Sequence, residues 1–172
     1  MDKGKMSKEE ILDFVEKKAV EAQLRDDTCA RSTLHGLSCY FDCITEKMVA
    51  ASWAFTGGVA ASSGSCGALC SSLFAIGAKY MPTVKEVENN VEGTQERFEF
   101  ARDKMFAFRD AFAREFGGLT CYKVQEGVLG RGYNLLEEKE LVEFLNLEGH
   151  REECGKVVGK AARMAAEFML DD

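Results

Sequence analysis

The sequence predicts an all-α fold, a compact single-domain bundle of about six to eight helices. Apolar residues recur at intervals of three and four along most of the chain, which is the period of an amphipathic helix. No run of alternating β-branched residues indicates a strand. The only proline, Pro82, leaves room for long helices. The 172 residues, 46% hydrophobic and 30% charged, are typical of one folded domain.

The first part of the chain predicts two helices, an N-terminal one within residues 1–27 and a second that begins at Cys29. Ser7 and Glu10 have the spacing of a capping box. The apolar stripe after it consists of Ile11, Phe14, Val15, Ala19 and Ala22. Asp26, Asp27 and Thr28 provide a stop and a new N-cap. The stripe of the second helix consists of Ala30, Thr33, Leu34, Leu37, Phe41 and Ile44.

The middle of the chain, from Met48 to Ala78, has no charged residue. Serines and Gly57-Gly58 interrupt it, so that neither half supplies the ~20 apolar residues of a membrane span. We expect two buried helices, at about 46–56 and 65–80, joined by the Gly/Ser-rich stretch 57–64 and ended by Pro82. Because this apolar stretch is long for a chain of this size, we also expect a homodimer.

The last part predicts one long helix and three further ones. Thr94 begins an amphipathic helix that runs through Phe116 to a C-cap at Gly117-Gly118. A short helix begins at Thr120-Cys121, a loop covers 127–132, a short helix covers 137–145, and a final helix covers 150–169.

The charge and the cysteines narrow the function. A net charge of −7 and a pI near 5.0 disfavour nucleic acid and anionic membranes as partners. The first residues run into a charged helical pattern rather than a signal peptide, so we expect a cytoplasmic protein. There, multiple cysteines indicate metal binding or redox chemistry. Because seven is an odd number, the cysteines cannot all pair within one chain. They include no CxxC pair, which disfavours a thioredoxin-like or zinc-ribbon protein.

Cys66 has the most suggestive local setting. It follows Ser63-Gly64-Ser65 and precedes Gly67, at the predicted start of a helix. Free backbone N–H groups and the helix dipole at such a position favour the thiolate, the form that ligates metals and exchanges disulfides. A small residue chosen for tight packing is the open alternative.

A second set of candidates follows from helical spacing. Cys39 and Cys43 are four residues apart, as are Cys66 and Cys70, so each pair faces one way, and two such pairs can close a four-thiolate site. Each histidine precedes a cysteine by four residues: His35 precedes Cys39, and His150 precedes Cys154. Core packing of Cys39, Cys43 and Cys70, and a surface or polar-packing role of the histidines, are the competing interpretations.

The order of several short motifs resembles the C-GCAxxG-C-C family of redox-active proteins, which are named for four spaced cysteines. The motifs are Thr28-Cys29-Ala30, Phe55-Thr56-Gly57-Gly58, Cys66-Gly67-Ala68, Ile76-Gly77-Ala78-Lys79-Tyr80, FAREFGGLTC at 112–121, and Cys154 before an alanine-rich helix. The resemblance covers about residues 28 to 168, and so makes 28–172 the redox domain of the chain.

The resemblance implies that Cys29, Cys66, Cys121 and Cys154 are the site residues. It also implies electron transfer with an oxidoreductase partner, and an iron–sulfur centre such as [2Fe–2S]. Zinc is an alternative for four thiolates. The glycine that ends the family motif is Cys70 here, which can add a ligand or a resolving thiol.

Helix geometry makes the two cysteine sets exclusive. If the second helix is unbroken, Cys43 lies about 21 Å and Cys39 about 15 Å from Cys29, so no single small centre uses both ends. Cys66 therefore joins either Cys29, Cys121 and Cys154, or Cys39, Cys43 and Cys70. We favour the first set, because Cys121 and Cys154 also lie near predicted helix starts.

We therefore expect an electron-transfer protein, or an accessory component of an oxidoreductase, that binds an iron–sulfur cluster or another thiophilic metal through four cysteines. One alternative is a metal-free thiol–disulfide protein in which Cys66 attacks and another cysteine resolves. A second alternative is a helical binding or scaffold module whose cysteines only pack.

Overall fold

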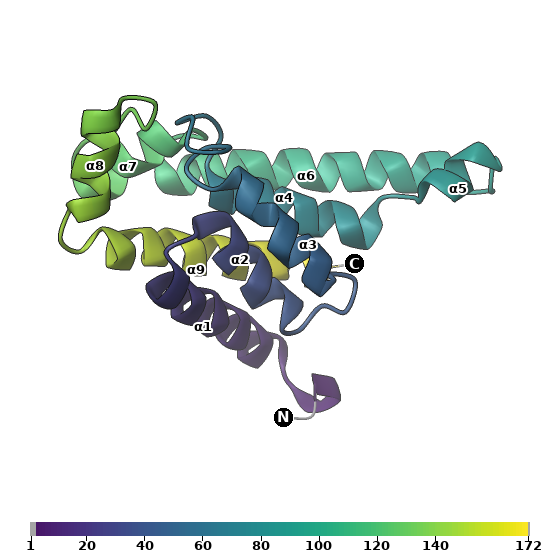
Figure 1. Ribbon diagram of the computed structural model, residues 1–172. Helices are drawn as coiled ribbons and strands as arrows, with labels where there is room; N and C mark the ends of the chain where they lie inside the picture. The colour runs from purple at the N-terminus through teal and green to yellow at the C-terminus, as the bar shows by residue number, and fades with distance from the viewer. Residues whose placement is uncertain (1–2, 172) are drawn as a thin grey trace.

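The computed structural model describes residues 3–171, and in that range it consists of helices without a strand (Figure 1). The all-α prediction is therefore confirmed. The α-helices are α1 (Lys8–Asp26), α2 (Cys29–Ser38), α3 (Glu46–Ala51), α4 (Gly67–Tyr80), α5 (Val84–Glu88), α6 (Thr94–Phe116), α7 (Cys121–Leu129), α8 (Glu138–Asn146) and α9 (His150–Leu170). Two short 3-10 helices are η1 (Lys3–Lys5) and η2 (Ser52–Phe55). None of the described helices has the length and apolar character that crossing a membrane requires.

Local signals set most helix ends. Ser7 and Glu10 form the predicted capping box at the start of α1, and Asp27 ends that helix in the left-handed conformation. Pro82 disfavours helical backbone at Met81, which is extended, so α4 ends at Tyr80. Gly117 provides the left-handed C-cap of α6.

The second helix is shorter than predicted. α2 ends at Ser38, and a turn connects it to α3, so the periodic positions Phe41 and Ile44 are buried but not helical. The Ser38 hydroxyl donates to the backbone carbonyl of His35 at 2.8 Å. Such bonds compete with the backbone hydrogen bonds of a helix, and this one lies where the helix stops.

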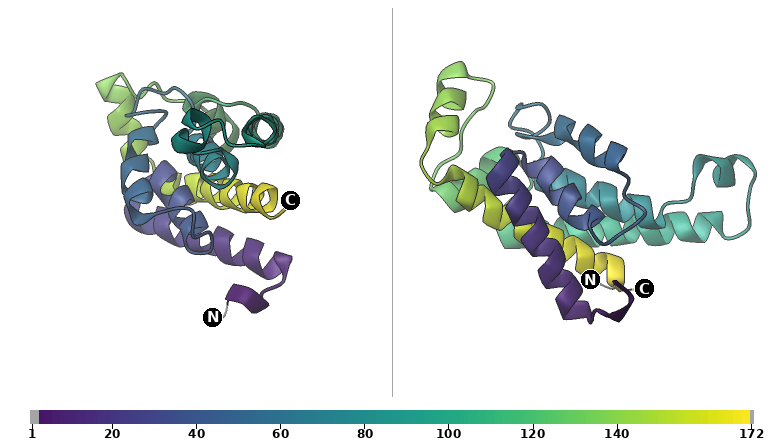
Figure 2. Two further views of the ribbon diagram at one scale, coloured as in Figure 1. Left: turned by 90° about the vertical axis from the view of Figure 1, so that its right-hand side faces the viewer. Right: turned by 60° about the horizontal axis from the view of Figure 1, so that its bottom comes forward.

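The core is built around α9, which packs on α1, α2 and α4 (Figures 1 and 2). Its inward face consists of small and medium residues, among them Val158, Ala161, Ala162 and Ala165, all fully buried. Small side chains let neighbouring helices approach closely. α6 covers α4 from the other side and contributes Phe108 and Phe112 to the core.

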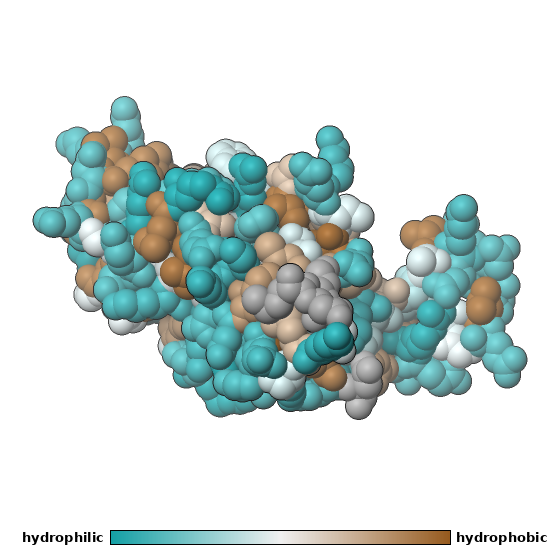
Figure 3. Space-filling model, turned by 90° about the horizontal axis from the view of Figure 1, so that it is seen from below, coloured by the Kyte–Doolittle hydropathy of each residue, from teal (hydrophilic) through white to brown (hydrophobic). Residues whose placement is uncertain are grey.

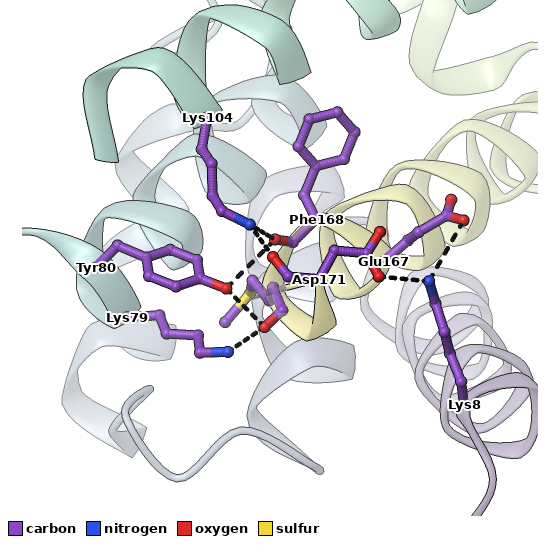
Figure 4. A network of polar contacts seen from close by, with 8 residues as sticks. Lys8, Lys79, Tyr80, Lys104, Glu167, Phe168 and Asp171 are labelled. Carbon is purple, nitrogen blue, oxygen red and sulfur yellow. Dashed lines mark hydrogen bonds and ion pairs between the residues drawn. The ribbon is translucent and has the colours of Figure 1, made fainter. Parts of the chain in front are cut away.

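Cations and a tyrosine hold the C-terminal end of α9 (Figure 4). Lys104 Nζ donates to the carbonyl of Phe168 at 3.0 Å, and the Tyr80 hydroxyl donates to that of Met169 at 2.8 Å. Lys8 on α1 pairs with Asp171 at 2.6 Å. These groups satisfy the last carbonyls and the negative end of the helix dipole, and they join α9 to α1, α4 and α6.

One part of the molecule projects from the bundle. Figures 1 and 2 show that α5 and the N-terminal half of α6 extend beyond the other helices as an arm. α5 was not predicted, although Thr83 and Glu86 form a capping box at its start. No residue of α5 is buried.

Candidate cysteine centre

The structure brings four cysteines from four separate segments to one small cavity. Cys29 begins α2, Cys66 is the N-cap of α4, Cys121 begins α7, and Cys154 lies in the first turns of α9. All four line a cavity of about 30 Å³. The rest of its wall is mainly apolar and consists of Ala68, Val124, Gln125, Val128, Val157 and Val158. The favoured set of the sequence prediction is thus the set that the fold assembles.

Backbone pairing holds Cys66 beside Cys121. The Cys66 N–H donates to the carbonyl of Leu119 at 2.8 Å, and the Cys121 N–H donates to that of Gly64 at 2.7 Å. These bonds flank an isolated antiparallel bridge between Ser65 and Thr120. Thr120 also caps α7, because its hydroxyl accepts from the Lys123 N–H. The starts of α4 and α7 therefore meet.

Gly67 permits the close approach of Cys29. A Cβ atom at Gly67 would lie 2.7 Å from Cys29 Sγ and 2.8 Å from the carbonyl oxygen of Phe55. Neither distance is compatible with a side chain, so this position of α4 requires glycine. The need for glycine comes from contacts with α2 and η2 and not from an unusual φ.

A left-handed turn forms another wall beside Cys29. Positive φ angles run through the consecutive residues Gly57, Gly58, Val59, Ala60 and Ala61, and recur at Ser63. Residues with a Cβ rarely adopt this conformation, and β-branched Val59, with φ +69°, is the most strained of them. The turn brings Gly57 and Ala61 next to Cys29 and Cys121. The predicted packing turn at 57–64 is therefore also a wall of the site.

Burial keeps the four thiols protonated in the absence of a cation. Burial is the largest cause that raises the pKa of Cys66 well above its ordinary value, and the neighbouring Cys29 and Cys121 raise that pKa further. The backbone N–H groups of Ala68 and Leu69 lower it by less. Burial likewise raises the pKa of Cys29, Cys121 and Cys154. The prediction that the helix start makes Cys66 a thiolate is wrong for the free thiol, because desolvation outweighs the dipole.

The sulfur of Cys29 is surrounded by donors that favour its charged form. Backbone N–H groups of Gly57, Ala30 and Gly67 all lower the pKa of this thiol, although burial has the larger, opposite effect. Gly57 belongs to the left-handed turn, and Ala30 and Gly67 belong to the first turns of α2 and α4. A cation that offset the burial would leave Cys29 with three donors suited to a thiolate.

A second cavity adjoins the thiols. It has a volume of about 120 Å³ and is lined by Cys29, Cys121 and Cys154, with Leu141 and Phe144 of α8 among its apolar walls. Four polar side chains also line it, those of Gln23, Asp27, Thr56 and Gln125. Among their atoms, Gln23 Oε1 and Thr56 Oγ1 are buried without a hydrogen-bond partner.

The histidines are held away from the cysteine centre. His150 is buried, with Nε2 2.8 Å from Asp27 Oδ2 and Nδ1 2.9 Å from the Leu147 carbonyl oxygen, so it joins α9 to the end of α1. His35 Nε2 lies 3.9 Å from Cys39 Sγ, on the part of α2 remote from Cys29. The polar-packing interpretation of His150 agrees with these contacts.

The other three cysteines lie outside the four-cysteine cavity. Cys39 is half-buried and Cys43 is exposed, so the core position expected for Cys43 is wrong. The reason is the early end of α2, which places Cys43 in a surface turn. Cys70 is half-buried and lines a groove with Phe74 and Met105.

The four cysteines share a cavity, but they do not form a site for one metal ion. Among residues 3–171, no three Cys, His, Asp or Glu side chains lie close enough together to hold one metal ion. The donor set itself, four cysteines in a largely apolar environment, is the kind that soft metals and iron–sulfur clusters prefer.

The structure places beside the thiols polar residues that the sequence patterns did not assign to the site. Asp27 and Gln23 at the end of α1, and Gln125 on α7, surround the thiols, and Gln125 Nε2 lies 3.6 Å from Cys121 Sγ. Gln125 was detectable only as a polar residue four positions after a cysteine, on the same face of a helix.

Comparison with known proteins agrees with the geometry. The profile of the family described as "Putative redox-active protein (C_GCAxxG_C_C)" matches residues 28–168, which is most of the chain and includes all four converging cysteines. No curated protein and no solved structure matches significantly. The chain therefore belongs to the C_GCAxxG_C_C family of redox-active proteins.

Proposed function

We propose that Cys29, Cys66, Cys121 and Cys154 hold an iron–sulfur cluster and that the protein transfers electrons to or from an oxidoreductase partner. The observation that carries the proposal is the convergence of four thiols, from four segments, on one buried cavity. Thiolates are the usual ligands of such clusters, and the cluster supplies a site that gains and loses an electron.

The lack of a ligand group that suits one ion, among residues 3–171, is the reason to prefer a cluster over zinc. In a tetrahedral zinc site with bonds of ≈ 2.3 Å, neighbouring sulfurs lie about 3.8 Å apart. No three candidate ligands among the described residues meet the demands of a single ion, whereas a cluster with bridging sulfides holds its cysteines farther apart. The adjoining cavity, which three of the same cysteines line, provides further room.

Electrostatics favours a bound metal centre over four free thiols. Four thiolates in one cavity would repel one another, and burial raises the pKa of each thiol. A positively charged iron centre offsets both effects, so metal binding releases protons and strengthens as pH rises. Backbone N–H groups around Cys29 stabilise its thiolate, and such bonds raise the reduction potential of a cluster.

The metal-free alternative has weaker support. A thiol–disulfide protein needs an accessible cysteine that ionises near neutral pH. Cys66 is 5% exposed, and burial raises its pKa. A scaffold role would not require four cysteines to share one cavity.

The test is anaerobic reconstitution of the full chain with ferrous iron and sulfide. We expect a brown protein with absorption between 300 and 600 nm (roughly the charge-transfer range of iron–thiolate centres) and bound iron and sulfide. The Cys66→Ser variant should lose most of the colour, and the matched Cys43→Ser variant should keep it. Colourless protein without iron after reconstitution would contradict the proposal, and stoichiometric zinc that resists iron would establish the zinc alternative.

A further inference from the structure

The arm formed by α5 and the N-terminal half of α6 carries apolar side chains that its own chain does not cover. Val84, Val87, Val91, Phe98 and Phe100 are exposed, and the exposed fraction reaches 72% at Val84. Figure 3 shows apolar residues on this projecting lobe. A five-residue helix such as α5 is not stable without packing, so these residues indicate a surface that another molecule covers.

A second uncovered apolar surface lies where α6 joins the bundle. It is a groove of about 610 Å³ between η2, α4 and α6, whose walls include Phe55, Leu73, Phe74 and Met105. Phe74 is 40% exposed. The groove is separate from the four-cysteine cavity, although Cys70 lies in it.

The arm and the groove follow one another along the same helix. Phe98 on the arm and Met105 in the groove are seven residues apart on α6, and therefore lie on the same face. A two-fold axis that crosses α6 between them would place the arm of each copy over the groove of the other. The dimer interface then contains two equivalent contacts, each between the arm of one copy and the groove of the other, as in an isologous dimer.

The charges along α6 fit this antiparallel arrangement. On α6, residues 94–100 carry two glutamates against Arg97. Residues 101–110 carry three basic residues against two aspartates. When two copies of α6 run antiparallel, the acidic segment of each lies along the basic segment of the other, which favours this partner and this direction.

We propose that two copies of this chain form a dimer by reciprocal exchange, with the arm of each copy seated in the α4–α6 groove of the other. A second copy is favoured over a different protein because the same chain offers both an apolar surface and an opposite charge to the arm and to the groove. The proposal is independent of the chemistry of the cysteine centre.

The first test is the mass of the full chain in solution by sedimentation velocity. We expect a dimer of twice 19.0 kDa for the wild type. Phe98→Glu on the arm and Phe74→Glu in the groove should each weaken dimerisation at least about 30-fold, as expected for a buried aromatic anchor. Val142→Glu on α8, where the side chain is 52% exposed, is the matched control and should leave the dimer intact.

Mixing the two variants tests the exchange itself. A heterodimer of Phe98→Glu and Phe74→Glu chains retains one unaltered arm and groove contact, so the mixture should dimerise where neither variant does alone. Unchanged circular dichroism would show that both variants are folded. A wild type that is monomeric at about 100 μM, a dimer that survives either substitution, or a mixture that stays monomeric would each overturn the proposal.

Discussion

The cysteines at the two ends of α2 differ in their neighbours: Cys29 and Cys39 are both half-buried, but only Cys29 lies among other cysteines. At the N-terminal end, the sulfur of Cys29 lies against Gly67 and faces three other cysteines across a buried cavity. Beyond the other end, Cys39 is half-buried and Cys43 is exposed. Each end of α2 offers a cysteine, but only Cys29 shares a cavity with residues of α4, α7 and α9. A cysteine therefore joins the site through the segments it meets and not through spacing within its own helix.

Disrupting the contact between Gly67 and Cys29 should have the greatest consequence for stability. Gly67→Ala should destabilise the protein by about 3 kcal/mol, because the new Cβ would lie 2.7 Å from Cys29 Sγ. It should also lower the iron content after reconstitution. Denaturant unfolding and iron analysis measure the two effects. Gly36→Ala is the matched control, since its Cβ would lie 2.6 Å from Ala19 Cβ, away from the thiols. Gly36→Ala should lose stability but bind as much iron per folded molecule as the wild type. If Gly67→Ala were as stable as the wild type, the contact between Gly67 and Cys29 would be refuted.

The second prediction concerns the pH dependence of stability, which should distinguish the cysteines at the two ends of α2. In the metal-free protein, burial raises the pKa of Cys29, Cys66, Cys121 and Cys154 above the ordinary 9.0. Above pH 9 the unfolded chain therefore loses protons that the folded chain keeps. Stability is fully present below that pH and falls above it, by about 1 kcal/mol per pH unit for each thiol.

Urea unfolding between pH 8 and pH 10 (roughly one unit on either side of an unperturbed cysteine pKa) measures this slope. Cys66→Ser should make it clearly shallower, because burial raises the pKa of Cys66 well above 9.0. Cys43→Ser should change it less, because Cys43 is exposed, although its partial burial raises its pKa. A stability that does not depend on pH in this range would show that the four thiols are not desolvated.

The third prediction concerns the strained wall beside Cys29. Val59→Gly should stabilise the protein by about 1 kcal/mol, because glycine adopts a φ of +69° without strain and Val59 is exposed. Thermal unfolding measures the change. Ala50→Gly, on the exposed face of α3, should instead lose up to about 1 kcal/mol. A loss of stability in Val59→Gly would mean that the left-handed turn is not formed.

The smallest effect is expected at the exposed end. Cys43→Ser should change the free energy of unfolding by less than about 0.5 kcal/mol, because the side chain has few contacts to lose. Its iron content should equal that of the wild type. A marked loss of iron would show that Cys43 contributes to iron binding, and the two ends of α2 would then not differ in this respect.

The helices were predictable because their signals are local. The capping box at Ser7, the stop at Pro82 and the glycine after Phe116 act within a few residues, and the structure has helix ends at each. The end of α2 was not predictable from its stripe. Phe41 and Ile44 are buried, as their apolar pattern requires, but a turn buries them as well as a helix would.

The four site cysteines were chosen partly by family resemblance, and their residue spacing alone left a second set open. The ionisation of Cys66 was predicted wrongly, because the dipole of α4 is a local property whereas burial depends on α2, α7 and α9. The sequence singled out Gly67 only as part of the motif Cys66-Gly67-Ala68. Its role depends on a sulfur that lies far away in the sequence.

Propensity, capping and periodicity within single segments fix the helical class and most helix boundaries, and the number of thiols is read directly from the sequence. Which cysteines share a cavity, which thiols are buried and how near Cys29 lies to Gly67 depend on the tertiary structure. Those properties arise between segments, from packing that removes water and from pairings such as that of Ser65 with Thr120. No local pattern along the chain specifies them.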